Sequence, residues 1–246
     1  MGVEMRGMSF LLVALVLLPF QVHAESAADY AYPISPSVGG RENTEWSTFY
    51  SYHTCDTNKT LPRVLLLGDS ITQSIRGRIE SILAGKAVVT YWVTSCGVVR
   101  PEYMAQLEIV LRTHDYAVIH FNNGLHMSNA RYAEYAAALE KALRLVKRLQ
   151  PKAKVLLATC TPLRDHPERC YVNHVNEIGI DLAKKLKLDG ITDLYSLANG
   201  FDRKKAWRDE AHFTPESQKE LASLAAECIL KVLPCEQKTK KPEDRK

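Results

Sequence analysis

Short apolar segments and longer amphipathic segments alternate along most of this chain, and this alternation restricts the fold more than any other feature. Five apolar runs rich in β-branched residues are each bounded by polar or glycine-containing turns: residues 64–67, 88–93, 117–121, 155–158 and 191–194. Runs of this length suit buried strands. Helix-spaced apolar residues fill the intervals between them, so the chain reads as strand and helix in turn.

Four of the amphipathic segments are long enough to predict helices. Their apolar residues recur every three or four positions, in series that begin at Ile71, Tyr132, Val172 and Leu221. The last series follows Thr214-Pro215-Glu216, which is typical of an N-cap residue followed by proline at the first helical position. Strand and helix alternating in this way predict an α/β fold, a three-layer α/β/α sandwich with a five-stranded, mainly parallel sheet. Such sheets bind ligands beyond the carboxyl ends of their strands.

Composition supports one folded domain and excludes several classes of protein. The 246 residues are 46% apolar and 24% charged, with a formal net charge of +4, which is unlike a disordered chain. The basic residues are scattered, so nucleic-acid binding is not indicated. No glycine-rich phosphate-binding motif is present in the sequence, and no nucleotide cofactor is expected. We place the domain at residues 61–235.

The N-terminal segment has the pattern of a secretory signal. Arg6 precedes an apolar run at residues 10–20, and Val22-His23-Ala24 resembles a cleavage site. The run is shorter than the roughly 20 residues that span a bilayer, although an uncleaved anchor is the alternative. We therefore predict a signal peptide at 1–24, an irregular arm at 25–60 and a polar tail at 236–246. The protein is expected to be secreted, or periplasmic in a Gram-negative host, with no membrane segment after cleavage.

Export would place the six cysteines in an oxidising compartment, where disulfides form. Two pairs are close in sequence, Cys160 with Cys170 and Cys228 with Cys235, and we favour the first because a polar loop separates its members. Asn58-Lys59-Thr60 is a glycosylation sequon, which has meaning in a eukaryotic host.

The first apolar run leads directly into Gly68-Asp69-Ser70, and a predicted helix follows. Ser70 is therefore expected at the carboxyl end of a strand and at the N-terminus of a helix. Unpaired N–H groups and the helix dipole favour a developing anion at such a position. Ser70 could act as a nucleophile if a base lies beside it, and the alternative is a simple Asp/Ser N-cap.

A candidate base and acid stand just before the last predicted helix. Asp209 and His212 lie three residues apart in one turn, so the carboxylate can orient the imidazole and stabilise its charged form. The alternative is an ordinary acid–histidine pair on the surface. Both this pair and Ser70 follow strands of the same predicted sheet, in the chain order Ser, Asp, His.

Leu67-Gly68-Asp69-Ser70 with Asp209-x-x-His212 resembles the motifs of the SGNH, or GDSL, hydrolases, over residues 62–233. The resemblance implies a serine ester hydrolase that needs no cofactor, with Ser70, His212 and Asp209 as its catalytic triad. It also implies an oxyanion hole formed by Ser70, Gly97 and an asparagine.

The asparagine block departs from the family pattern. The family has G-x-N-D after the third strand, whereas this chain has Phe-Asn-Asn-Gly-Leu-His at 121–126. Depending on the register, Asn122 or Asn123 would supply the amide donor. His120 and His126 lie nearby, but without acidic residues at ligand spacing no metal site is predicted.

Secreted members of the family often remove O-acetyl groups from polysaccharides, so the resemblance implies a secreted esterase acting on acetylated carbohydrate or another small ester. The alternatives are a lysophospholipase, a thioesterase or an acyltransferase with the same triad. A non-catalytic carbohydrate-binding protein on the same fold is the alternative from a different class.

Overall fold

The structure is a computed structural model that describes residues 44–52, 61–127, 132–165 and 170–234. Its centre is a six-stranded sheet in the order β1-β3-β2-β4-β5-β6. The strands are β1 (Ser47–Ser51), β2 (Arg63–Gly68), β3 (Val88–Thr94), β4 (Val118–Phe121), β5 (Lys154–Ala158) and β6 (Gly190–Thr192). Strands β2 to β6 pair in parallel, whereas β1 pairs antiparallel with β3. The α/β class and the mainly parallel sheet are as predicted.

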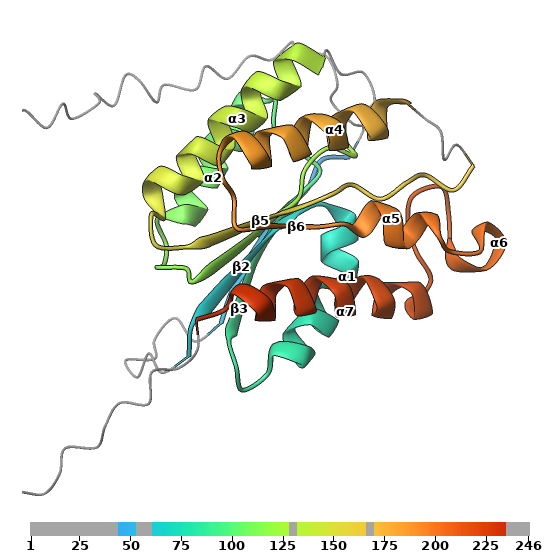
Figure 1. The fold of residues 1–246 in the computed structure, drawn as a ribbon, viewed down its shortest axis with the longest axis horizontal. Coiled ribbons are helices and arrows are strands. Elements are labelled where there is room, and N and C mark those ends of the chain that lie inside the picture. Colours follow the sequence, from blue (N-terminus) through green and yellow to red (C-terminus); the bar gives the residue numbers. More distant parts are fainter. Residues whose placement is uncertain (1–43, 53–60, 128–131, 166–169, 235–246) are drawn as a thin grey trace, which may run out of the picture. The chain divides into compact units, whose positions relative to one another are not determined.

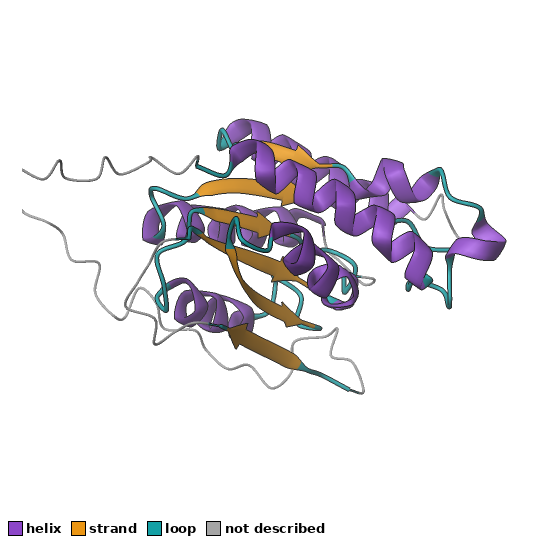
Figure 2. Ribbon diagram, turned by 90° about the horizontal axis from the view of Figure 1, so that it is seen from below, coloured by secondary structure: helices purple, strands orange, loops and turns teal. Residues whose placement is uncertain are grey.

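Helices cover both faces of this sheet, which gives the predicted three layers (Figures 1 and 2). One layer holds α1 (Ser70–Leu83) and α7 (Pro215–Val232), and the other holds α2 (Pro101–Leu111), α3 (Tyr132–Leu149) and α4 (Cys170–Lys185). Two short helices, α5 (Leu194–Asn199) and α6 (Arg203–Ala206), follow β6 in the chain and precede α7.

The alternation of side chains along the strands explains the two layers. Val64 and Leu66 of β2 belong to the apolar core that α1 and α7 complete. On β5, Leu156 belongs to the same core, but its neighbour Leu157 points the other way, toward Gly179 of α4. Successive strand residues face opposite sides of a sheet, so buried strands are apolar on both.

The sheet has one strand more than predicted, because β1 lies within the segment predicted to be an irregular arm. Phe49 and Tyr50 of this strand are 40% and 50% exposed. Its order comes from main-chain pairing with β3, in a register that runs from Ser47 opposite Thr94 to Ser51 opposite Thr90. An edge strand that buries little leaves no apolar pattern in the sequence. The other calls on the N-terminal region, the signal peptide at 1–24 and the sequon at Asn58, lie outside the described residues, as does the tail at 236–246.

Helices α2, α5 and α6 were not predicted, although the sequence of α2 has a pattern typical of a helix. Its buried side chains recur at helical spacing and begin at Tyr103, after a proline at the first helical position. Strand β6 ends at Thr192, two residues earlier than predicted, because Asp193 caps α5 by accepting a hydrogen bond from the Ser196 N–H at 3.0 Å. Within the described part of the chain, no helix is long and apolar enough to cross a membrane.

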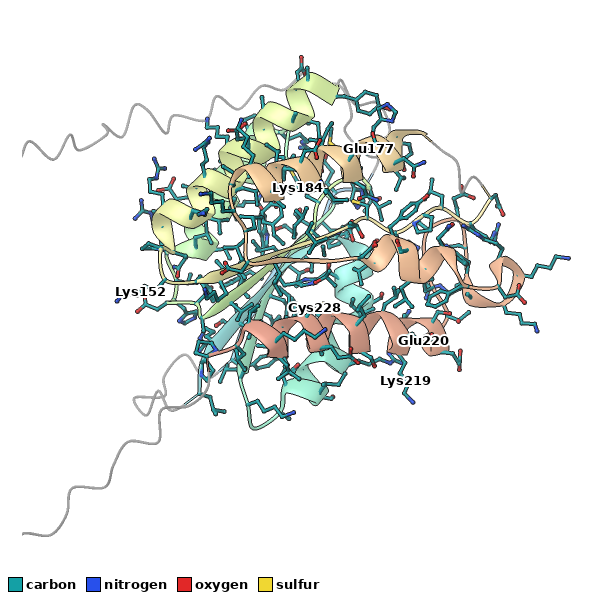
Figure 3. All side chains as sticks on the ribbon, viewed as in Figure 1. Lys152, Glu177, Lys184, Lys219, Glu220 and Cys228 are labelled. Carbon is teal, nitrogen blue, oxygen red and sulfur yellow. The ribbon has the colours of Figure 1, made fainter. Side chains whose placement is uncertain are left out.

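The expected Cys160–Cys170 disulfide is not supported, because Cys160 is a free and buried thiol. Its main-chain N–H donates to Asn176 Oδ1 at 2.8 Å, and burial raises the pKa of the thiol. Cys228, labelled on α7 in Figure 3, is also free. The side chain of Cys170 lies outside the described residues, and so does Cys235.

Candidate active site

Ser70 lies where the sequence places it, as the first residue of α1 directly after β2. The preceding Asp69 is the N-cap, and its carboxylate accepts a hydrogen bond from the Ile71 N–H at 2.9 Å. The capping role and the candidate nucleophile thus belong to two neighbouring residues. Gly68 makes the tight turn sterically feasible, because a Cβ there would lie 2.0 Å from Thr72 Oγ1.

Asp209 and His212 are brought together by a single turn before α7. Both carboxylate oxygens of Asp209 lie 2.9 Å from His212 Nδ1. Asp209 Oδ1 also accepts hydrogen bonds from the main-chain N–H groups of Ala211 at 3.0 Å and His212 at 2.8 Å. Partial burial opposes ionisation of this carboxyl, but these hydrogen bonds and the imidazole outweigh it and lower its pKa to about 2. Asp209 is therefore an anion at neutral pH.

The packing of α1 against α7 joins the two halves of the site. His212 Nε2 lies 2.8 Å from Ser70 Oγ, so Ser70, His212 and Asp209 form a continuous hydrogen-bonded chain. The side chains of His212 and Asp209 are 33% and 49% exposed, which leaves the chain open to a ligand from solvent. A serine with one imidazole nitrogen on its hydroxyl and a carboxylate on the other nitrogen is an arrangement for nucleophilic catalysis.

Gly97 lies in the loop of residues 95–100, called the Gly97 loop below, between β3 and α2. A Cβ at Gly97 would lie 2.9 Å from Met127 Sδ and 3.5 Å from the His126 carbonyl oxygen. Glycine therefore allows this loop to lie close to the segment that follows β4. The Val98 N–H donates to Asn123 Oδ1 at 3.1 Å, which fixes the two segments to each other.

The two candidate asparagines have different surroundings. Asn122 is buried, and its amide group donates to the carbonyls of Ala158 at 3.0 Å and Thr159 at 3.3 Å. Its donors therefore hold the end of β5. The amide of Asn123 faces the Gly97 loop, where Nδ2 lies 3.5 Å from the Cys96 carbonyl, and the side chain also hydrogen-bonds to Tyr103. Of the two asparagines, Asn123 is the one whose amide lies beside the Gly97 loop, and the choice between them as oxyanion donor stays a prediction.

The two histidines near this loop differ in position. His120 is buried on β4 and hydrogen-bonded to Thr192 Oγ1 at 3.2 Å, and burial lowers its pKa to about 4. His126 is half-buried and lies near Asp69, whose pKa is raised by burial and lowered in part by this imidazole. In the described part of the chain, no group of three or more His, Cys, Asp or Glu side chains could hold a metal ion.

A second serine–histidine contact was not anticipated. Ser51 Oγ, at the end of β1, lies 2.7 Å from His114 Nε2. Thr90 Oγ1 lies 3.2 Å from the same hydroxyl, and Arg63 Nη1 donates to it at 3.3 Å. Arg63 begins β2, so this pair lies at the amino edge of the parallel strands, whereas Ser70 lies at their carboxyl edge.

A surface cavity of about 560 Å³ lies along α5 and α7. Leu197 lines it from α5, and Lys219 and Glu220, labelled in Figure 3, line it from α7. None of its lining residues belongs to the triad, so this cavity does not define the candidate active site.

The fold is that of the SGNH, or GDSL, hydrolases. The solved structures that resemble it include a GDSL-like lipase, a member of the lipolytic G-D-S-L family and two esterases, each matched over nearly its full length. No protein-family model matches the sequence, and no curated protein matches it either. The resemblance therefore rests on three-dimensional structure.

Three of these neighbours illustrate the similarity. A carbohydrate esterase family 3 protein from Talaromyces cellulolyticus has a TM-score of 0.59 at 12% identity, over 70% of this chain and 98% of that chain. The acetyl xylan esterase AlAXEase has a TM-score of 0.58 at 16% identity, over 68% and 99%. A member of the lipolytic G-D-S-L family from Veillonella parvula has a TM-score of 0.53 at 17% identity, over 69% and 97%.

Proposed function

We propose that this protein is a secreted serine esterase that hydrolyses O-acetyl esters on carbohydrate. The observation that carries the proposal is the 2.8 Å contact between Ser70 Oγ and His212 Nε2, with Asp209 held on the other imidazole nitrogen. The nucleophile stands at a helix N-terminus, where the chemistry of ester cleavage needs it.

The geometry supports the following sequence of steps. His212 removes the proton from Ser70 Oγ as that oxygen attacks the ester carbonyl, and Asp209 stabilises the imidazolium. The main-chain N–H groups of Ser70 and Gly97 and the amide of Asn123 then bind the oxyanion. His212 returns the proton to the leaving alcohol, and an acyl-enzyme remains on Ser70. Water activated by His212 releases the acid and restores the serine.

Two observations support carbohydrate as the substrate class. The first is the pair of neighbours described as a carbohydrate esterase and an acetyl xylan esterase. The second is an aromatic pair at the start of α3 and α4, where the rings of Tyr132 and His174 stack at 4.8 Å and Tyr132 is 36% exposed. Exposed rings offer a flat apolar surface, which suits the apolar face of a sugar.

The aromatic pair is linked to the candidate active site through both helices. One turn after Tyr132, Tyr135 donates its hydroxyl to the Asn123 carbonyl at 2.7 Å. One turn before His174, the Tyr171 hydroxyl donates to the Leu125 carbonyl at 3.5 Å. Both rings therefore stand one helical turn from residues that contact the loop of Asn123, where a chain of sugar residues extending from the ester could reach them.

Acetate release tests the proposal directly. The chain from residue 25 to 246, the product expected after signal cleavage, is assayed on p-nitrophenyl acetate, acetylated xylan and acetylated pectin beside Ser70→Ala. We expect turnover in the wild type and residual activity in the variant. Tyr132→Ala should raise KM for acetylated xylan several-fold and leave p-nitrophenyl acetate unaffected.

Two results would overturn the proposal. Full activity in Ser70→Ala would mean that another residue is the nucleophile. No acetate release from any substrate, together with no labelling of Ser70 by a fluorophosphonate, would favour the non-catalytic alternative. Secretion is tested separately by sequencing the N-terminus of protein exported from its host, which we expect to begin at Glu25.

A further inference from the structure

We propose that the segment before β1 positions the Gly97 loop for catalysis, through an ion pair between Glu45 and Arg100 and hydrogen bonds between Trp46 and Ser95. Glu45 and Arg100 are thus positioning residues, which act through the main chain of Gly97. The inference rests on the proposed function, because it assigns a role to the N–H group of Gly97 in binding the oxyanion.

The first contact extends the pairing of β1 and β3 beyond the strands. The Trp46 N–H donates to Ser95 Oγ at 3.0 Å, and the Ser95 N–H donates to the Trp46 carbonyl at 3.1 Å. The same carbonyl accepts a hydrogen bond from Thr94 Oγ1 at 2.9 Å. The first residue of the Gly97 loop is therefore held by both main-chain groups of Trp46.

The second contact holds the other end of the loop. Arg100 is only 6% exposed, and its guanidinium pairs with Glu45 through both Nη atoms, with Nη2 3.2 Å from Oε2. Hydrogen bonding to Glu45 raises the pKa of this guanidinium further, against the opposing effect of burial. Arg100 Nη2 also lies 3.4 Å from Glu102 Oε1, on the helix that Arg100 precedes. Glu45 contacts both Nη atoms, so it is the partner that ties this buried charge to the segment before β1.

Arg100 is tied in turn to the glycine. Its main-chain N–H donates to the Gly97 carbonyl at 3.0 Å, and from the other side Val98 donates to Asn123. The Gly97 loop is thus anchored at its start, at its end and at its middle, and two of these three anchors come from Glu45 and Trp46. Oxyanion donors are effective because they are held in place before the reaction begins.

A rate measurement distinguishes positioning from simple stabilisation. Glu45→Ala should lower kcat on p-nitrophenyl acetate by about 10- to 100-fold with little change in KM, since a displacement of about 1 Å can reduce the rate 100-fold. Affinity for a trifluoromethyl ketone, which forms a tetrahedral adduct with an active-site serine, should fall by a similar factor. Glu45→Gln, which keeps an acceptor for Arg100, should recover part of kcat.

Ser47→Ala, in β1 two residues after Glu45, is the matched control. Ser47 Oγ donates to Gln106 at 2.7 Å and accepts from Trp92 Nε1 at 2.9 Å, so this variant weakens the attachment of β1 without touching the Gly97 loop. It should lower the melting temperature and keep kcat within about twofold of wild type.

The outcomes separate this inference from the proposed function. Wild-type kcat in Glu45→Ala, or an equal loss of kcat in Ser47→Ala, would overturn the inference while Ser70-dependent hydrolysis by the wild type stands. A wild-type protein that hydrolyses no ester would remove the proposed function, and the inference with it.

Discussion

Two edges of one sheet each hold a serine in contact with a histidine, and the contacts are nearly equal in length. Ser70 and His212 meet at 2.8 Å at the carboxyl edge, and Ser51 and His114 meet at 2.7 Å at the amino edge. The distance alone therefore does not identify a nucleophile. The surroundings of each serine must decide.

The main chain differs most between the two edges. Ser70 begins a helix, so its N–H group belongs to the first turn, which has no partners within the helix. Ser51 is paired with Thr90 in a strand, and its hydroxyl contacts Thr90 and Arg63. At the carboxyl edge, the Ser70 hydroxyl lies beside an imidazole held by a carboxylate, at a helix N-terminus whose N–H groups are available to a developing anion.

Removing each histidine in turn is the strongest test of this comparison. His212→Ala should reduce kcat/KM on p-nitrophenyl acetate by at least about 10⁴-fold, because the general base is lost. His114→Ala should keep kcat/KM within about twofold of wild type. A large loss of activity in His114→Ala without a loss of melting temperature would contradict the assignment.

The carboxylate is the next element to remove. Asp209→Asn should lower kcat by about 10³- to 10⁴-fold, because an amide can hold His212 in the wrong tautomer and cannot stabilise its charged form. Single-turnover acylation of Ser70 measures this effect. An unchanged rate would mean that the Asp209 carboxylate does not contribute to the reactivity of Ser70 and His212.

Asparagine variants refine the comparison within the carboxyl edge itself. Asn123→Ala should lower kcat by about 10²- to 10³-fold, the usual effect of removing an oxyanion donor. Asn122→Ala should act mainly on stability, because it removes hydrogen bonds to Ala158 and Thr159. Measuring kcat and melting temperature for both variants separates the roles, and a reversed pattern would restore Asn122 as the donor.

A third histidine gives the smallest expected effect. The pKa of His120 is about 4 in the fold, below its ordinary value of 6.5, so the native state binds fewer protons than the unfolded state. The free energy of unfolding therefore decreases as the pH falls below 6.5, and the decrease due to His120 is about 3 kcal/mol near pH 4.

Denaturant unfolding from pH 7.5 to pH 4 measures this loss, with His120→Leu as the reference. The variant should lose about 3 kcal/mol less than wild type over the interval, and the difference isolates His120 because Asp69 titrates in both proteins. Parallel curves would show that His120 is not held in its neutral form.

Most of the fold could be predicted because its strands bury side chains on both faces. Val64 and Leu66 pack under α1 and α7, and such buried runs are visible in a sequence. Strand β1 was not predicted, because it pairs with β3 through the main chain while Phe49 and Tyr50 remain exposed. Main-chain pairing does not need a buried apolar run, which is the signal by which the other strands were predicted.

The candidate site also has contacts that could be predicted from the sequence and contacts that could not. Asp209 and His212 lie within one turn, so their contact could be expected from spacing alone. The choice between Asn122 and Asn123 could not, because it depends on which amide reaches Ala158 across the sheet. The free thiol of Cys160 is also a property of its buried position and not of its spacing from Cys170.

The proposed base, His212, and acid, Asp209, lie close in sequence, but the proposed nucleophile, Ser70, is 142 positions away from His212. The docking of α7 on α1, with Arg78 donating to Gln218 at 3.4 Å among its contacts, helps to join them. A small displacement of α7 would separate His212 from Ser70 while every strand stayed paired. The proposed ester hydrolysis therefore depends on how α7 packs against α1. During gradual denaturation, we expect this activity to be lost before circular dichroism records any loss of secondary structure.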